Sequence, residues 1–207
     1  MEQIKFLLPE IILVLLSFAL LINSIIDQDD KEITNKILLI LGSIISIIIL
    51  VNLKEYGLYL NDTFENNELT SKIKILLVVG TLLTLLLISN SKTEQFKKFF
   101  DEYCFLLILS LVGGMIVVSS REFLTLIISF EILSIPIYLI TAMGPNSNKS
   151  IEASTKLFFF GTLSTVFLIF SAVLFYSLSG STYFNEINWV SKDAIIILST
   201  IFLLITM

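Results

Sequence analysis

The stretch LTLIISFEILSIPIYLI, residues 124–140, places one charged side chain, Glu131, in the middle of a long apolar run. A membrane-spanning helix needs roughly 20 predominantly apolar residues, and this run meets that length when its flanks are included. An acidic group at the centre of a span costs about 2.5–3.5 kcal/mol on insertion scales. We therefore expect a transmembrane helix whose carboxyl faces protein or water, is protonated, or has a cationic partner.

The composition of the whole chain is that of a membrane protein. Of its 207 residues 56% are hydrophobic and 15% are charged, and the mean hydropathy is +0.94, whereas soluble domains have about 45–50% apolar residues. The net charge is −5, and no basic patch points to nucleic acid as a partner. The sequence has no histidine and one cysteine, Cys104, which excludes imidazole chemistry and an internal disulfide. We expect Cys104 to be a small buried apolar side chain.

Apolar segments separated by polar connections predict one all-α transmembrane domain over residues 1–207, with about seven helices. The N-terminal segment is interpreted as a retained helix, because no cleavage site of small residues follows it. The last segment, AIIILSTIFLLITM, is only 14 residues long. We expect that span to be incomplete, with the chain either truncated or continued by a second polypeptide. The predicted spans are residues 6–26, 33–59, 73–88, 103–118, 123–143, 151–178 and 194–207.

Polar side chains follow Glu131 along one face of its predicted helix. Ser134, Tyr138 and Thr141 lie three, seven and ten residues farther on, a spacing that keeps them on the face of the acid. Pro136 cannot donate to the carbonyl of Ile132, which leaves that oxygen for a side chain or water. The pattern predicts a stop for a hopping proton at Glu131, supported by Ser134, Pro136 and Tyr138. The alternative is a polar clamp between helices, with a neutral, hydrogen-bonded Glu131.

The remaining charges near the spans have simpler interpretations. Lys156, near the start of the sixth span, could snorkel to the headgroups, pair with Glu152 four residues before it, or take part in function. Glu10 follows Pro9 in the first turn of the first span, where an acid is favoured by the helix dipole. The polar connections are expected to contain Lys72 and Lys74, and the lysines divide too evenly between the two sides to predict orientation. Lys54 and Glu55 are expected to mark an interfacial end of the second span.

Small residues at two places predict close helix packing. One is the pair Gly113–Gly114 in the fourth span. The other is Gly161 in the sixth span, together with Ser164 and Thr165.

Three stretches resemble one family of membrane proteins. FEILSIPIYLI, residues 130–140, is similar to the acidic helix of the antiporter-like subunits of respiratory NADH:quinone oxidoreductase (complex I). SIEASTKLFFFGTLSTVFLIFSAVLFYSLSGS, residues 150–181, resembles most closely the subunit 2 branch, and LLPEIILVLL, residues 7–16, resembles the first helix of that branch. The resemblance spans most of the chain and is specific over residues 121–182.

The resemblance implies an antiporter-like bundle and a role in proton translocation as one subunit of an enzyme complex. Glu131 then matches the family's fifth-helix glutamate and Lys156 its sixth-helix lysine, and the two form a proton relay. In the family a further lysine on the seventh helix pairs with this glutamate, and the present chain ends a few residues before that position. The implied partners are other membrane-arm subunits, lipid, and a second polypeptide that carries the remaining helices. The chain itself is expected to hold no cofactor, since flavin, iron–sulfur clusters and quinone belong to other subunits.

Two further assignments remain open on the sequence. The chain could instead be a subunit of a related cation/proton antiporter or membrane hydrogenase, or a non-catalytic structural subunit that has kept an ancestral acid. The resemblance and the composition, rich in Ile, Phe, Asn and Lys, favour the mitochondrial inner membrane as its location. The bacterial plasma membrane is the alternative.

Overall fold

The structure is a computed structural model that describes residues 2–26, 32–53, 56–89, 99–144, 147–187 and 194–206. Seven α-helices make up most of this part of the chain, so the expected all-α membrane bundle is confirmed. The smaller elements are the 3₁₀ helices η1 (Glu2–Leu7) and η2 (Phe184–Glu186), and a hairpin of β1 (Gly57–Tyr59) and β2 (Phe64–Asn66). The helices are α1 (Leu8–Ile26), α2 (Glu32–Asn52), α3 (Glu68–Ser89), α5 (Phe100–Ser119), α6 (Phe123–Ala142), α7 (Ser147–Ser179) and α8 (Ala194–Thr206).

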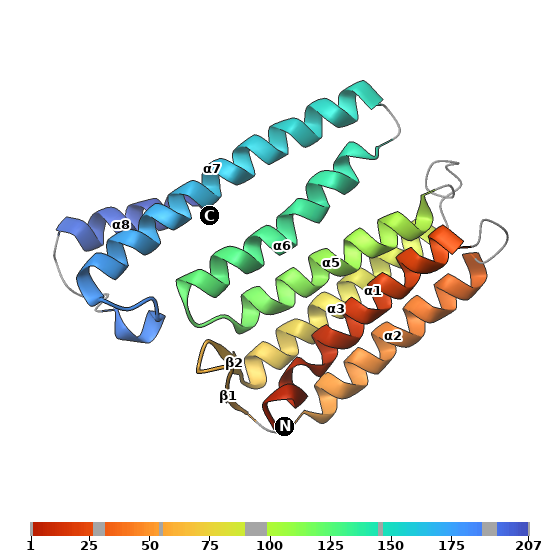
Figure 1. Cartoon of the computed structure of the whole chain (residues 1–207), viewed down its shortest axis with the longest axis horizontal. Helices are drawn as coiled ribbons and strands as arrows, with labels where there is room; N and C mark the ends of the chain where they lie inside the picture. The colour runs from red at the N-terminus through yellow and green to blue at the C-terminus, as the bar shows by residue number, and fades with distance from the viewer. Residues whose placement is uncertain are drawn as a thin grey trace.

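The helices form one compact group and one extended row (Figure 1). In the group, α1 packs against α2 and α5, and α3 packs against the same two helices. In the row, α6 lies against α5, α7 against α6, and α8 against α7. The main apolar core lies inside the group, where Leu20, Val78 and Met115 are fully buried. A smaller core around Phe123 and Phe175 joins the start of α6 to the end of α7.

Five of the described helices are long and apolar enough to cross a membrane. A spanning helix must satisfy all its backbone hydrogen bonds internally, which a continuous helix of about 20 residues does. Together with the apolar surface of the bundle, this makes the chain a multi-pass membrane protein. The five spans are Lys5–Asn23, Glu68–Ser89, Phe100–Ser119, Phe123–Ala142 and Asn148–Ser179, and shorter apolar stretches are Ile37–Asn52 and Ala194–Thr206.

The predicted second span, residues 33–59, is too long at its C-terminal end. The helix α2 ends at Asn52, and Gly57–Tyr59 forms a strand that pairs antiparallel with Phe64–Asn66. The turn between the strands holds Leu60, Asn61 and Asp62 at positive φ, a conformation that Asn and Asp tolerate better than most residues. The turn chemistry of LNDT therefore overrides the apolar pattern before it. Lys54 and Glu55 lie outside the described residues.

The predicted third span, residues 73–88, begins too late, and Lys74, at its N-terminal edge, was wrongly counted with the connection before it. The helix α3 starts at Glu68, because the Asn67 side chain caps it by accepting a hydrogen bond from the Thr70 amide at 2.7 Å. The predicted span already held Lys74 as its second residue. The earlier start adds about one turn and places Lys74 in the second turn of the helix. The boundaries of the other spans differ by a few residues, except that α7 begins four residues before the predicted 151.

Both predicted small-residue contacts are confirmed. A Cβ on Gly113 would lie 2.4 Å from the backbone nitrogen of Leu133, so this glycine lets the backbones of α5 and α6 approach closely. A Cβ on Gly161 would collide with the hydroxyl of Tyr138, so that glycine makes room for an α6 side chain against α7. Cys104 is fully buried in α5, as expected. The two glycine contacts hold α6 between its neighbours and so fix the position of Glu131.

Candidate functional site

Glu131 is half-buried on α6 and faces α7. The hydroxyl of Thr165 on α7 donates a hydrogen bond to Glu131 Oε1 at 2.7 Å. The carboxyl therefore has a protein partner, as the cost of placing an acid within a span requires. This contact also explains why Thr165 belongs to the small polar set around Gly161.

A cavity of about 390 Å³ lies beside this contact, between α6, α7 and α8. Ser134 and Tyr138, the predicted polar neighbours of Glu131, both line it, and Thr165 lines it from the other side. The rest of its wall is mostly apolar, with Leu and Phe side chains. The structure thus brings two of the three stripe residues to one cavity that is large enough to hold several water molecules. The third, Thr141, does not line it, and its hydroxyl donates to the carbonyl of Ile137. The remaining lining residues are Leu126, Phe130, Gly161, Ser164, Leu168, Leu203 and Thr206.

Pro136 is buried inside α6, next to the close contact with α5. A proline in a helix removes one backbone hydrogen bond and disturbs the turn before it. In the structure the hydroxyl of Ser110 on α5 donates to the carbonyl of Leu133 at 3.0 Å, one residue beyond the carbonyl of Ile132 named by the prediction. A side chain of the neighbouring helix thus donates a hydrogen bond to a carbonyl of the turn that the proline disturbs.

Lys156 is not brought to Glu131 in the structure. It pairs with Glu152 across one helical turn, as one of the predictions held, and its side chain is 66% exposed. It lies nine residues before Thr165 on α7 (165 − 156), about 13 Å along the helix axis. Within the described residues, Glu131 has no cationic partner. The predicted relay roles of Glu131 and Lys156 therefore remain predictions.

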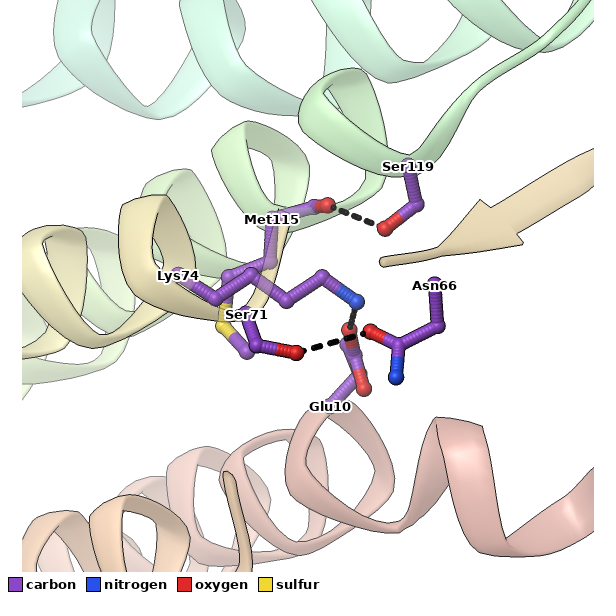
Figure 2. A network of polar contacts seen from close by, with 6 residues as sticks. All are labelled: Glu10, Asn66, Ser71, Lys74, Met115 and Ser119. Carbon is purple, nitrogen blue, oxygen red and sulfur yellow. Dashed lines mark hydrogen bonds and ion pairs between the residues drawn. The ribbon is translucent and has the colours of Figure 1, made fainter. Parts of the chain in front are cut away.

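A second acid–amine pair, which the sequence pattern did not predict, lies in the other part of the bundle. Lys74 on α3 donates to Glu10 on α1 with 2.6 Å between Nζ and Oε1 (Figure 2). The side chains are only 1% and 6% exposed. Glu10 does lie in the first turn of α1, as predicted, but its partner is the buried amine and not solvent. Its second oxygen, Oε2, is buried without a hydrogen-bond partner among the described residues.

Polar side chains from the hairpin and from α5 surround the pair (Figure 2). Ser71, one turn before Lys74, donates to Asn66 Oδ1 at 3.2 Å, and Ser119 donates to the carbonyl of Met115 at 3.1 Å. The Tyr59 hydroxyl interacts with Lys74 and Ser119. Burial raises the pKa of Tyr59 above its ordinary value of 10.0, and the nearby Lys74 charge opposes that rise in part. The hairpin thus caps a polar cluster at one end of the compact group.

The sequence held a signal for this second pair. An acid directly after a helix-initiating proline is often solvated, and this made Glu10 look like a helix start. The signal was Asn67, since capping of α3 at this residue moves Lys74 from the N-terminal edge of the predicted span into the second turn of the helix. A charge at that position of a span needs a partner of opposite sign.

The C-terminal part of the chain is similar to known sequences. Residues 120–207 match a family described as "NADH:quinone oxidoreductase/Mrp antiporter, TM". NADH-quinone oxidoreductase subunit N 2 of Thermodesulfovibrio yellowstonii is 35% identical over 104 residues, which is 50% of this chain and 23% of that protein. Subunit N of Rhodobacter capsulatus is 37% identical over 86 residues, 42% of this chain and 18% of that protein. The matched stretches therefore cover about a fifth of the length of these relatives.

Two solved structures share the fold of nearly the whole chain. A chain of respiratory complex I from Thermus thermophilus superposes with a TM-score of 0.78 at 21% identity, covering 96% of this chain and 42% of that one. A chain of the archaeal membrane-bound sulfane sulfur reductase has the same TM-score at 16% identity, covering 99% of this chain and 44% of that one. The fold is thus that of an antiporter-like bundle, of which this chain spans less than half.

Proposed function

We propose that the chain is part of a proton-translocating, antiporter-like subunit in the membrane arm of an NADH:quinone oxidoreductase, equivalent to the N-terminal part of subunit 2, the subunit N of bacteria. The observation that carries the proposal is the Glu131–Thr165 hydrogen bond beside a cavity lined by Ser134 and Tyr138. The similarity of residues 120–207 to the antiporter family supports it, because that range contains Glu131 and Lys156.

Glu131 acts in this proposal by setting the proton affinity of an amine. A lysine near a buried carboxylate keeps its proton, because the opposite charge offsets desolvation, and it releases the proton when the carboxylate charge or position changes. The amine would come from a helix beyond the seven described here, carried by the same chain or by a second polypeptide. The two groups would titrate as a unit.

Lys156 has a separate place in the proposal, at the mouth of the hydrated path. Its exposed side chain reaches water, and its pair with Glu152 holds it at that end of α7. Pro136 and its disturbed turn fix the backbone between Glu131 and Tyr138, so that the two side chains keep their places beside the cavity.

Electron transfer would take place elsewhere in the complex. Flavin, iron–sulfur clusters and quinone would be held by other subunits, and this chain would contribute only the proton path. Its partners would be the other membrane-arm subunits and lipid. We place it in the mitochondrial inner membrane, and the bacterial plasma membrane is the second possibility.

The test replaces Glu131 by Gln, which keeps the shape and the Thr165 contact but removes the charge. In the assembled complex, we expect fewer protons translocated per NADH oxidised, or a lower coupled rate. The control is Glu68→Gln, which removes an exposed acid from α3, away from the cavity. Unchanged proton translocation in assembled Glu131→Gln complex would refute the role of Glu131.

A second candidate function is a subunit of a related cation/proton antiporter or a different membrane-bound oxidoreductase. The fold shared with the sulfane sulfur reductase chain favours this alternative. Co-purification with flavin and iron–sulfur subunits that oxidise NADH would separate the two. A purely structural subunit would instead leave proton movement unchanged when Glu131 is replaced.

A further inference from the structure

We propose that Glu10 and Lys74 form a second proton-exchange site, in which Lys74 carries an exchangeable proton and Glu10 controls it. This inference rests on the proposed proton-translocating role, but it concerns a different acid, a different amine and a different part of the bundle. The pair lies outside residues 120–207, the range that matches the antiporter family.

The two charges lie together in the apolar interior of the compact group. An isolated charge in an apolar interior is strongly disfavoured, and two charges are tolerated there only as a close pair. Lys74 and Glu10 meet at 2.6 Å with almost no exposure, on helices that both qualify as membrane spans. At this separation the ionic pair and the neutral amine–acid pair differ by the transfer of one proton between Nζ and Oε1.

The Glu10 carboxyl has a second oxygen, which Lys74 does not contact. Glu10 Oε2 is buried and accepts no hydrogen bond from the described residues. A carboxylate oxygen in that position is costly unless it binds water or a proton. It therefore marks the point at which a proton can leave the pair or return to it, on the side opposite to Lys74.

Hydrogen-bonded side chains of α3 and the hairpin lie near the pair on the way to the protein surface. Ser71, on the face of Lys74, donates to Asn66 in β2, and the next residue, Asn67, donates to Glu65 at 3.2 Å. Glu65 is 41% exposed and also contacts Arg121. Polar side chains thus lie between the turn before Lys74 and the partly exposed carboxylate of Glu65.

The groups that face the pair set its charge balance. In the part of the chain that the structure describes, Tyr59 of β1 is a titratable neighbour, and its hydroxyl interacts with Lys74. From β2, α3 and α5 the neighbours are Asn66, Ser71, Met115 and Ser119, which carry no charge (Figure 2). The charge of the Lys74 ammonium is therefore held mainly by Glu10.

The exchange conserves atoms and charge. An N–H bond of Lys74 breaks and an O–H bond forms on Glu10, which converts the ionic pair into a neutral pair without changing the total charge. The carboxyl group then rotates, so that its O–H takes the position of Oε2, and the proton passes from there to a water molecule. An amine and a carboxylate remain, with a net charge of −1. Return of a proton from water reverses these steps.

Lys74→Arg separates exchange from structure, because a guanidinium keeps the ion pair but does not deprotonate in proteins. In the assembled complex, we expect the rate of proton translocation to fall by about 10²-fold, the lower end of what a positioned acid or base contributes. The control is Lys72→Arg, on the same helix and paired with the exposed Glu68, which should leave the rate unchanged. An assembled Lys74→Arg complex with the wild-type rate would overturn the proposal.

The double variant Glu10→Gln/Lys74→Met removes both charges and retains similar volumes, so it tests the same point if arginine does not fit. A buried ion pair replaced by well-packed neutral residues often leaves stability unchanged. We therefore expect this complex to assemble and to lose proton translocation. Wild-type translocation in the double variant, or failure of both variants to assemble, would show that the pair is structural and would contradict the proposal.

The same assay on Glu131→Gln keeps this inference distinct from the proposed function. Loss in Glu131→Gln with the wild-type rate in Lys74→Arg would remove only the second site. Loss in Lys74→Arg with the wild-type rate in Glu131→Gln would support the second site and remove the role of Glu131.

Discussion

Two parts of the bundle differ in whether a buried acid has a cation beside it. They are the compact helix group of α1, α2, α3 and α5 and the extended row of α6, α7 and α8. In the group, Glu10 and Lys74 neutralise each other inside the chain, under the hairpin. In the row, Glu131 has only the hydroxyl of Thr165, and Lys156 lies on an exposed face with Glu152. The group therefore contains a buried acid with its own cation, whereas the described part of the row provides no cation for Glu131.

The two regions also differ in how much of their apolar helix surface is buried within the chain. In α5, 56% of the apolar span is buried within the chain, and in α7 only 11% is. An apolar face that the chain does not cover must meet lipid or another protein surface in the membrane. The row is also the region that resembles the antiporter family. Glu131, which the sequence pattern identified, therefore lies in the row, whose apolar surface the chain leaves largely uncovered. The Glu10–Lys74 pair, in which both partners are present, lies in the compact group.

The largest effect on stability is expected when one partner of the buried Glu10–Lys74 pair is removed. Lys74→Met leaves the Glu10 carboxylate buried without a partner, which costs roughly 3–5 kcal/mol. The thermal midpoint of the purified complex, or the yield of assembled complex, should fall sharply. Lys72→Met, which removes an exposed amine two residues earlier on the same helix, should leave both unchanged. If Lys74→Met were as stable as Lys72→Met, the pair would not hold the group together.

The joint between the two regions is the next most sensitive position. Gly113→Ala puts a methyl group 2.4 Å from the Leu133 nitrogen, and the backbones of α5 and α6 must separate. Overpacking of this kind costs about 1–3 kcal/mol. The matched control is Gly80→Ala in α3, where a Cβ meets nothing within 4 Å. Thermal unfolding should separate the two variants, and equal midpoints would mean that the helices are not in close contact.

A smaller effect is expected from the hairpin. Tyr59→Phe removes a buried hydroxyl that interacts with Lys74 and Ser119, at a cost of about 0.5–1.5 kcal/mol. Because burial raises the pKa of Tyr59, its contribution to stability is present below pH 10.0 and is lost as the pH rises through the folded value. The variant should therefore lose less stability than the wild type at alkaline pH. A pH series of thermal midpoints with parallel curves would contradict this.

The smallest effect on stability is expected in the open row. Lys156→Gln breaks an exposed pair within one helix, of a kind worth about 0.3–0.5 kcal/mol. The thermal midpoint should hardly move, while proton translocation should fall if Lys156 lies at the mouth of the path. A variant with unchanged stability and unchanged translocation would limit Lys156 to its pair with Glu152.

The sequence predicted the helices well and the partners of their charges poorly. Length and hydropathy place a span because each is a property of one segment, and the stripe of Ser134 and Tyr138 follows from helical geometry alone. The strand at Gly57–Tyr59 was missed because its apolar residues continue the pattern of α2. The Glu10–Lys74 contact joins residues 64 positions apart, and no local pattern specifies such a pairing. Only the cap at Asn67, which places Lys74 in the second turn of a helix, indicated that this amine needed a partner.

The most direct test of the central claim is a high-resolution map of the assembled complex around Glu131. We predict that the carboxyl keeps its contact with Thr165 and faces both ordered water in the cavity and an amine from a helix outside the described residues. A carboxyl turned toward lipid acyl chains, or closed off from every amine and from water, would contradict the account.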